Sequence, residues 1–272
     1  LTVAHIRFYP QLSPVDELQH IDYLYKAPDI VRNGEKVGQD AMRHAGGTGV
    51  RCTLDTMNTV AVIDYGMGNL RSVCKALEHV SDDQRVLLTS NPQDLLRADR
   101  VVFPGQGAIG GCVGALDELG LRPALLQAMQ TKPFLGICLG LQALYEFSEE
   151  GGGTQGLGVF KGRVPLFPRE QMRDALTGQV LKVPHMGWNQ VTQTKPHPLW
   201  SGIPQDERFY FVHSYFVESR ERQAVAGITE YGLRFTSAAG RDNIFAVQFH
   251  PEKSQHAGLQ LLKNFLNWDG EA

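Results

Sequence analysis

Short apolar runs alternate with longer helix-like segments along most of the chain after residue 58. Each run has the length and composition of a buried strand, and each intervening segment has helical spacing. Strands and helices that alternate in this way predict an α/β fold with a mainly parallel central sheet flanked by helices. The expected strands are 60–63, 86–88, 101–103 and 134–137, and the expected helices are about 70–80, Leu139 through Phe147 and about 256–268.

The pattern changes between about 157 and 240, where apolar and β-branched runs occur without helical spacing. This part predicts a β-rich second half of the domain. Residues 184–189 read Pro-His-Met-Gly-Trp-Asn, and we expect a compact loop there. The β-rich runs are 159–160, 180–183, 209–212 and 215–217.

Residues 1–56 differ from the rest, because prolines interrupt them and their apolar residues have no sustained period. Met57 stands directly before the first regular strand. We therefore expect 1–56 to be an extension of unclear order, or a start assigned too early, and 57–272 to be the functional domain. The alternative is a small docked subdomain, with 21–25 as one strand.

Composition narrows the classes of function. The net charge of −3 gives no electrostatic reason to bind nucleic acid or an anionic membrane. No apolar run approaches the length of a membrane span, and the amino end does not read as a secretory signal. The four cysteines are scattered without a Cys-x-x-Cys pair, which argues against a zinc or disulfide framework and favours a cytoplasmic location.

Cys138 lies between two glycines, in the sequence Gly-Ile-Cys-Leu-Gly. Glycines two residues before and after a nucleophile allow a strand to turn sharply into a helix with the nucleophile exposed at the turn. A lone cysteine in a strand is more often an inert core residue. The glycines at 136 and 140 favour a nucleophile instead.

The loop 104–107, Pro-Gly-Gln-Gly, directly follows the predicted strand 101–103. Successive glycines let backbone N–H groups converge on one point, where they can stabilise an oxyanion. The loop and Cys138 both lie at the carboxyl ends of predicted strands, where active-site loops of α/β sheets gather. The turn at 64–69 is also rich in glycine, but it lacks the pattern of a phosphate-binding loop.

His250 ends the apolar run 244–249, and Glu252 follows two residues later. A thiol nucleophile needs a base and a third group that orients the base. Cys138, His250 and Glu252 supply these three roles. The simpler alternative is that His250 and Glu252 only cap the last helix, but their combination with the two glycine motifs favours a triad.

Two further histidines, His185 and His213, could ligate a metal. Neither has a cysteine or carboxylate at metal-ligand spacing, so we expect no metal and interpret both as structural residues or supports of the site.

Taken together, these motifs resemble the class I (triad) glutamine amidotransferases, and more narrowly the glutaminase subunits of imidazole glycerol phosphate synthase. The resemblance covers residues 58 to about 268, and no counterpart is recognised for 1–56. The motifs occur in the order found in the family and are 64–73, 104–108, 136–142, 184–189, 213–215 and 248–254.

The resemblance implies hydrolysis of glutamine through a thioester on Cys138, with no cofactor. It also implies a heterodimer in which ammonia passes to a separate (β/α)₈ cyclase subunit. The implied roles are oxyanion stabilisation by Leu139, Gly105, Gln106 and Gly107, substrate binding by Gln142, Glu150, Ser214 and Tyr215, and contact with the cyclase by Asn69, Met186, Trp188 and Lys253.

Three alternatives stay open at this point: the glutaminase of another amidotransferase, a peptidase or γ-glutamyl hydrolase with the same Cys-His pair, and a non-catalytic subunit that keeps only the fold. Gln142 and the cyclase-contact motifs disfavour the hydrolases. An intact triad disfavours the non-catalytic subunit. Met186 and Trp188 could also be ordinary core residues.

Overall fold

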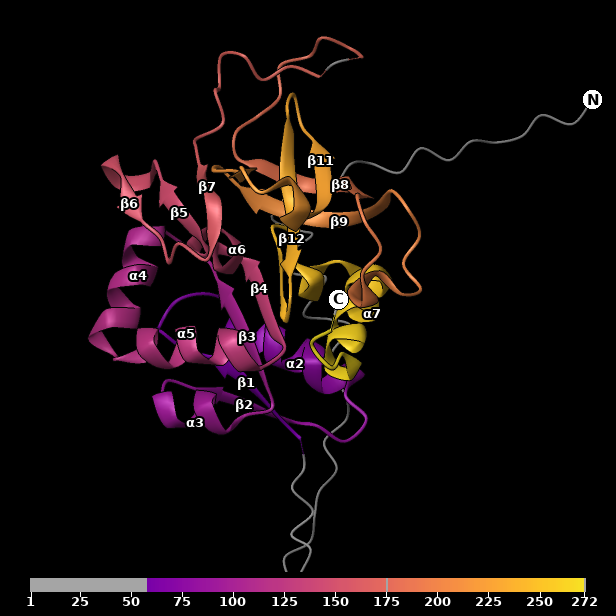
Figure 1. Cartoon of the computed structure of the whole chain (residues 1–272). Coiled ribbons are helices and arrows are strands. Elements are labelled where there is room, and N and C mark those ends of the chain that lie inside the picture. The colour runs from indigo at the N-terminus through magenta and orange to yellow at the C-terminus, as the bar shows by residue number, and fades with distance from the viewer. Residues whose placement is uncertain (1–57, 175, 272) are drawn as a thin grey trace, which may run out of the picture. The chain divides into compact units, whose positions relative to one another are not determined.

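A nine-stranded sheet forms the centre of the domain in the computed structural model, which describes residues 58–271 except residue 175 (Figure 1). The predicted extension 1–56 lies outside the described residues. Among the described residues, no helix is long and apolar enough to cross a membrane. The strands follow in the order β2 (Arg85–Thr89), β1 (Thr59–Ile63), β3 (Arg100–Gly105), β4 (Phe134–Cys138), β13 (Ile244–Val247), β12 (Arg234–Arg241), β11 (Val225–Glu230), β8 (His185–Gln193) and β9 (Glu207–His213).

The first five strands of this order are parallel, and the remaining pairings are antiparallel. The parallel half therefore comes from the four strands expected at 60–137 together with β13. The antiparallel half comes from the β-rich part of the sequence. The expected α/β fold is confirmed.

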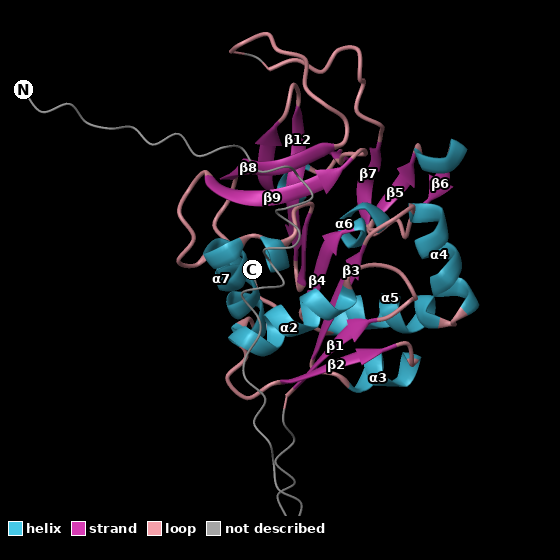
Figure 2. Ribbon diagram, turned by 180° about the vertical axis from the view of Figure 1, so that it is seen from behind, coloured by secondary structure: helices cyan, strands magenta, loops and turns pink. Residues whose placement is uncertain are grey.

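Helices cover both faces of the parallel strands (Figures 1 and 2). Successive residues of β1 point to opposite faces, so Val60 and Val62 join one buried cluster and Ala61 and Ile63 join the other. Burial on both sides explains why these strands read as continuous apolar runs. On one face lie α2 (Leu70–Val80) and α7 (Gln255–Asn267), and on the other lie α3 (Pro92–Arg97), α4 (Ile109–Glu118) and α5 (Leu121–Thr131).

Four expected elements differ from the structure. The β-rich runs 180–183 and 215–217 are not strands and contain only isolated bridges, at Val180, Tyr215 and Val217. The helix after Cys138, α6, spans only Leu139–Ala143, and Tyr145–Ser148 forms strand β5. Tyr145 and Ser148 are buried in a second sheet, which draws the chain out of the helix. The compact loop expected at 184–189 is instead the start of β8, since His185 pairs with His213 and Asn189 with Phe209 of β9.

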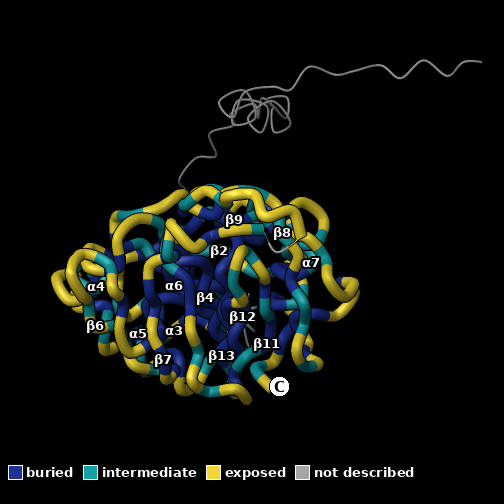
Figure 3. Tube along the Cα trace, turned by 90° about the horizontal axis from the view of Figure 1, so that it is seen from above, coloured by how far each residue is buried: buried dark blue, intermediate teal, exposed yellow. Residues whose placement is uncertain are grey.

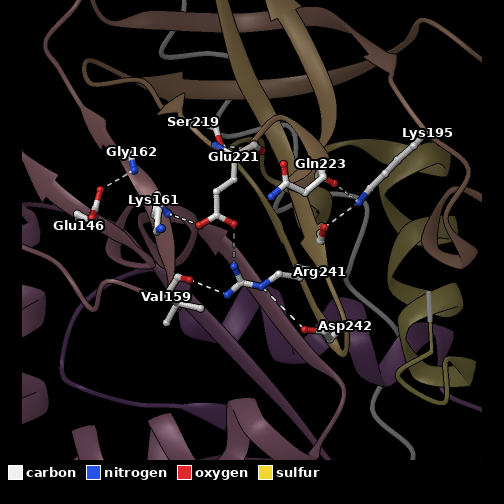
Figure 4. Close-up of polar contacts among 11 residues, drawn as sticks. Glu146, Val159, Lys161, Gly162, Lys195, Ser219, Glu221, Gln223, Arg241 and Asp242 are labelled. Atoms are coloured by element: carbon white, nitrogen blue, oxygen red, sulfur yellow. Dashed lines mark hydrogen bonds and ion pairs between the residues drawn. The ribbon is translucent and has the colours of Figure 1, made fainter.

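The second sheet has four short strands, β10 (Glu218–Ser219), β7 (Phe160–Val164), β5 and β6 (Thr154–Gln155). Arg241, at the end of β12, ties it to the central sheet (Figure 4). Its guanidinium donates to Glu221 Oε2 at 2.7 Å and to the Val159 carbonyl at 2.7 Å, and Glu221 Oε1 accepts from the Lys161 N–H at 2.8 Å. Charge-assisted bonds of this kind fix the orientation of one sheet on the other.

The central strands are the most deeply buried part of the domain, as the tube view from above shows for β4, β12 and β13 (Figure 3). In register, Gly105 of β3 lies opposite Cys138 of β4, and Val247 of β13 lies opposite Ile137. The carboxyl ends of three parallel strands therefore meet around Cys138.

Candidate active site

Cys138 occupies the sharp turn between β4 and α6, with φ 55° and ψ −104°. A non-glycine residue rarely adopts this conformation, and such strain is typical of functional positions. The glycine on each side is needed for packing: a Cβ at Gly140 would overlap the Phe103 carbonyl oxygen, and a Cβ at Gly136 would lie 2.9 Å from the Ala246 Cβ. The strand-to-helix turn predicted around the cysteine is confirmed.

The candidate base follows β13, the strand next to β4. His250 Nδ1 lies 2.8 Å from Glu252 Oε1, and the two side chains are only 2% and 1% exposed. Pro251 begins the short 3₁₀ turn η4 (Pro251–Lys253), which brings the carboxylate back onto the ring. His250 Nε2 makes no hydrogen bond to another described residue. Because Nδ1 is engaged by Glu252, Nε2 is the ring nitrogen available to the neighbouring Cys138 thiol.

Charges around His250 favour its protonated form. Burial by itself lowers the pKa of His250, but the Cys138 thiolate and the Glu252 carboxylate together outweigh burial and raise the pKa to about 10. An imidazole held between these two groups can take up a proton from the thiol and keep it. That is the behaviour required of a general base that later acts as an acid.

The candidate oxyanion loop lies beside the thiol. Gln106 and Gly107 line the same cavity as Cys138 and Leu139. The Tyr65 hydroxyl donates to the Pro104 carbonyl at 3.0 Å, which holds the start of the loop from behind. The predicted donors, Leu139 and residues 105–107, are therefore all adjacent to the cysteine.

A cavity of about 400 Å³ is lined by Cys138 and by all four predicted substrate contacts. Gln142 is buried, and its Nε2 donates hydrogen bonds to the Tyr215 carbonyl and to Gln248 Oε1, both at 3.0 Å. Glu150 Oε2 accepts from the Ile109 N–H at 2.8 Å, at the start of α4. The lining is Gln106, Gly107, Cys138, Leu139, Gln142, Glu150, Pro184, Val212, His213, Ser214, Tyr215 and Lys253.

The predicted cyclase contacts lie at the surface around this site. Met186 and Trp188 are 59% and 42% exposed, which rules out their alternative interpretation as core residues. They alternate along β8 with buried His185, so they point away from the core. Asn69 is exposed, and Lys253 is half-buried at the cavity wall.

Two residues of the site were missed by sequence reasoning. Gln248 is fully buried, and its Nε2 lies 3.6 Å from Cys138 Sγ. Tyr65 supports the oxyanion loop as described above. Both belong to motifs singled out in the sequence, but a buried polar role is visible only once the sheet order places residues 248 and 65 near 138 and 104.

No metal site accompanies this arrangement in the described part of the chain, where no group of three or more His, Cys, Asp or Glu side chains could hold an ion. His185 and His213 are instead hydrogen-bonded to each other.

Comparison with known proteins defines the class first. The sequence model of the family "Glutamine amidotransferase class-I" matches residues 61–268. Two solved structures share the fold: a glutamine amidotransferase, with a TM-score of 0.56 at 16% identity over 76% of this chain and 97% of its own, and PurLQS from Thermotoga maritima, with a TM-score of 0.56 at 15% identity over 78% and 98%.

Closer relatives then define the particular family. The "Imidazole glycerol phosphate synthase subunit HisH" of Dechloromonas aromatica is 62% identical over 210 residues, which are 77% of this chain and 96% of the relative. The subunit of the same name from Aromatoleum aromaticum is 59% identical over 212 residues, or 78% and 99%. The chain belongs to the HisH family of class I glutamine amidotransferases, and its enzymatic activity is that of a glutaminase.

Proposed function

We propose that this protein is the glutaminase subunit of imidazole glycerol phosphate synthase, that it hydrolyses L-glutamine at Cys138, and that it delivers the ammonia to a separate cyclase subunit, HisF. The proposal rests above all on one observation. The strained Cys138 and the buried His250–Glu252 pair meet beside a cavity that also contains Gln142 and Glu150.

In the proposed reaction, His250 Nε2 takes the proton of the Cys138 thiol, and Sγ attacks the γ-carbonyl carbon of glutamine. Backbone N–H groups of Leu139 and of the Gly105–Gly107 loop stabilise the negative charge on the carbonyl oxygen. The C–N bond then breaks, and ammonia leaves with the proton from His250. Water adds to the thioester by the same route, which releases glutamate and restores the thiol.

Four residues are proposed to bind the rest of the substrate. Gln142 Nε2 is already engaged, so its Oε1 is the atom left to accept from the α-amino group. Glu150 is held by the start of α4, and its second oxygen, Oε1, is proposed to accept from the same group. Backbone atoms of Ser214 and Tyr215 complete the wall.

The proposed heterodimer forms on the surface that carries Asn69, Met186, Trp188 and Lys253. This surface lies next to the cavity, since Lys253 lines both. Delivery of ammonia across it would keep the product out of water. The functional domain is proposed to be 57–272 and to work in the cytoplasm, where its catalytic thiol stays reduced.

The proposal is tested by glutamate release from glutamine, measured for this chain alone and with a HisF subunit and its nucleotide ligand. We expect a low rate alone and a strong rise only when both are added. Cys138→Ser should abolish glutamate release. Retained turnover in that variant would reject the thioester mechanism, and a high rate without the partner would reject the coupled glutaminase.

A further inference from the structure

A chain of hydrogen bonds begins on β8, the strand whose exposed face carries Met186 and Trp188. Asn189 Nδ2 lies 3.3 Å from His185 Nε2, and His185 Nδ1 lies 3.0 Å from His213 Nε2. His213 Nδ1 lies 2.8 Å from the carbonyl oxygen of Tyr215. Three buried or half-buried side chains thus connect the strand to the wall of the cavity.

The same carbonyl continues the chain to the nucleophile. The Tyr215 oxygen also accepts from Gln142 Nε2 at 3.0 Å, and this amide donates in addition to Gln248 Oε1 at 3.0 Å. Gln248 Nε2 then lies 3.6 Å from Cys138 Sγ. Residues far apart in sequence therefore form one connected network that ends at the thiol.

The Tyr215 carbonyl at the end of this chain determines which nitrogen of each histidine donates and which accepts. A carbonyl oxygen only accepts, so His213 carries its proton on Nδ1, and Nε2 of the neutral ring accepts from His185 Nδ1. His185 Nε2 is then an acceptor for the amide of Asn189. A second proton on either ring would place a donor against a donor.

The surroundings favour this neutral state. Burial and the neighbouring His213 lower the pKa of His185 to about 3. Burial lowers the pKa of His213 to about 4, although the bond to Tyr215 opposes it. The His185 ring is stacked on Tyr231 at 3.9 Å and on Phe211 at 4.8 Å between ring centroids, which fixes its plane.

We propose that His185 and His213 are positioning residues, which fix the Tyr215 carbonyl and through it hold Gln142 and Gln248 against the Cys138 thiol. The proposal rests on the proposed role of Cys138 and adds a function for two histidines that touch neither the thiol nor a metal. It also links the nucleophile to β8, whose outer face carries the proposed cyclase contacts.

Two substitutions at one position separate the hydrogen bond from the packing. His185→Asn keeps an N–H donor near the position of Nδ1 but loses the ring, whereas His185→Phe keeps the stacked ring but loses both nitrogens. The measured quantities are the rate of Cys138 alkylation by iodoacetamide and kcat for glutamine in the complex with HisF. Modification of Cys138 is confirmed by peptide mass.

We expect His185→Phe to lower both rates by about ten- to hundredfold, because His213 Nε2 loses its donor, and His185→Asn to stay within about threefold of the unchanged protein. The proposal is overturned if both rates for His185→Phe equal or exceed those for His185→Asn. Packing of the ring, and not its hydrogen bond, would then set the reactivity of Cys138. His197→Phe and His197→Asn are matched controls, because His197 is a buried histidine outside the network.

A measurement on the unchanged protein does not depend on the folding of variants. Nitrogen-15 NMR should show His185 and His213 as neutral Nδ1–H tautomers at pH 7. An Nε2–H tautomer at His213 would contradict the directed chain. Failure of the proposed site is recognised separately, because Cys138 would then not be the alkylated thiol or Cys138→Ser would retain turnover.

Discussion

His250 Nδ1 lies 2.8 Å from Glu252 Oε1. The two residues are only two positions apart in the sequence, but their contact serves a thiol on a distant strand. The carboxylate fixes the ring so that Nε2 faces away from Glu252, and β13 carries that ring to the end of β4. A base oriented in this way is ready to serve a thiol on a different strand.

Loss of the carboxylate charge should impair catalysis without removing the side chain. Glu252→Gln is expected to lower kcat about 10²- to 10⁴-fold, because the ring loses both its orientation and the charge that stabilises imidazolium. The pKa of His250 should fall below about 10, since Glu252 is one of the groups that raise it. Steady-state kinetics and an NMR titration of His250 measure the two effects. A kcat within twofold of the unchanged protein would exclude Glu252 from the triad.

The stability of the fold should decrease in acid because of His197, a buried histidine remote from the site. Burial, with Lys195, lowers the pKa of His197 to about 4, whereas the unfolded value is about 6.5. Above pH 6.5 the ring is neutral in both states and contributes nothing. Between pH 6.5 and about 4 the unfolded chain binds a proton that the fold excludes, so stability falls as the pH falls.

His197→Phe should remove this contribution. We expect urea unfolding at pH 6 and pH 5 to show that the free energy of unfolding depends less on pH in the variant, by about 1.2 kcal/mol over this one pH unit. Circular dichroism at pH 7.5 checks that the variant folds. An identical slope would show that His197 does not titrate on unfolding.

Gly105 is required by close packing in the candidate oxyanion loop. A Cβ there would overlap the Tyr65 hydroxyl and lie 3.0 Å from the Leu139 Cβ. Gly105→Ala should therefore displace the loop and lower kcat about 10²- to 10³-fold, because an oxyanion donor is lost. Gly114→Ala in α4 is the control, since a Cβ at Gly114 would meet no atom within 4 Å. Normal kcat in Gly105→Ala would remove the loop from catalysis.

Trp188 should contribute to partner binding and not to folding, because it is 42% exposed. Trp188→Ala is expected to weaken HisF binding about ten- to thirtyfold and to reduce stimulation of the glutaminase, with the melting temperature unchanged. Leu119→Ala is a matched control, since Leu119 is 44% exposed at the end of α4, a helix that lies well apart from β8 (Figure 1). Unchanged stimulation would exclude Trp188 from the interface.

Local sequence determined the elements that carry the site. The apolar run and the two glycines around Cys138 specify a strand, a sharp turn and a helix, because each of these preferences acts over a few residues. The same holds for β13, which ends three residues before His250, and for the turn that returns Glu252. Local sequence does not determine where α6 ends. The helix stops early because Tyr145 is buried in the second sheet.

Tertiary structure alone decided which distant groups meet. Strand order and register bring Gln248 to Gln142 and Cys138, and His185 to His213. No short stretch of sequence specifies that order or register. The start of β8 was expected to be a loop because its partners in β9 lie between 20 residues (Asn189 with Phe209) and 28 residues (His185 with His213) away along the chain. Periodicity specifies what each segment becomes, whereas the free energy of burying polar groups with their partners, summed over the whole sheet, specifies where each segment goes.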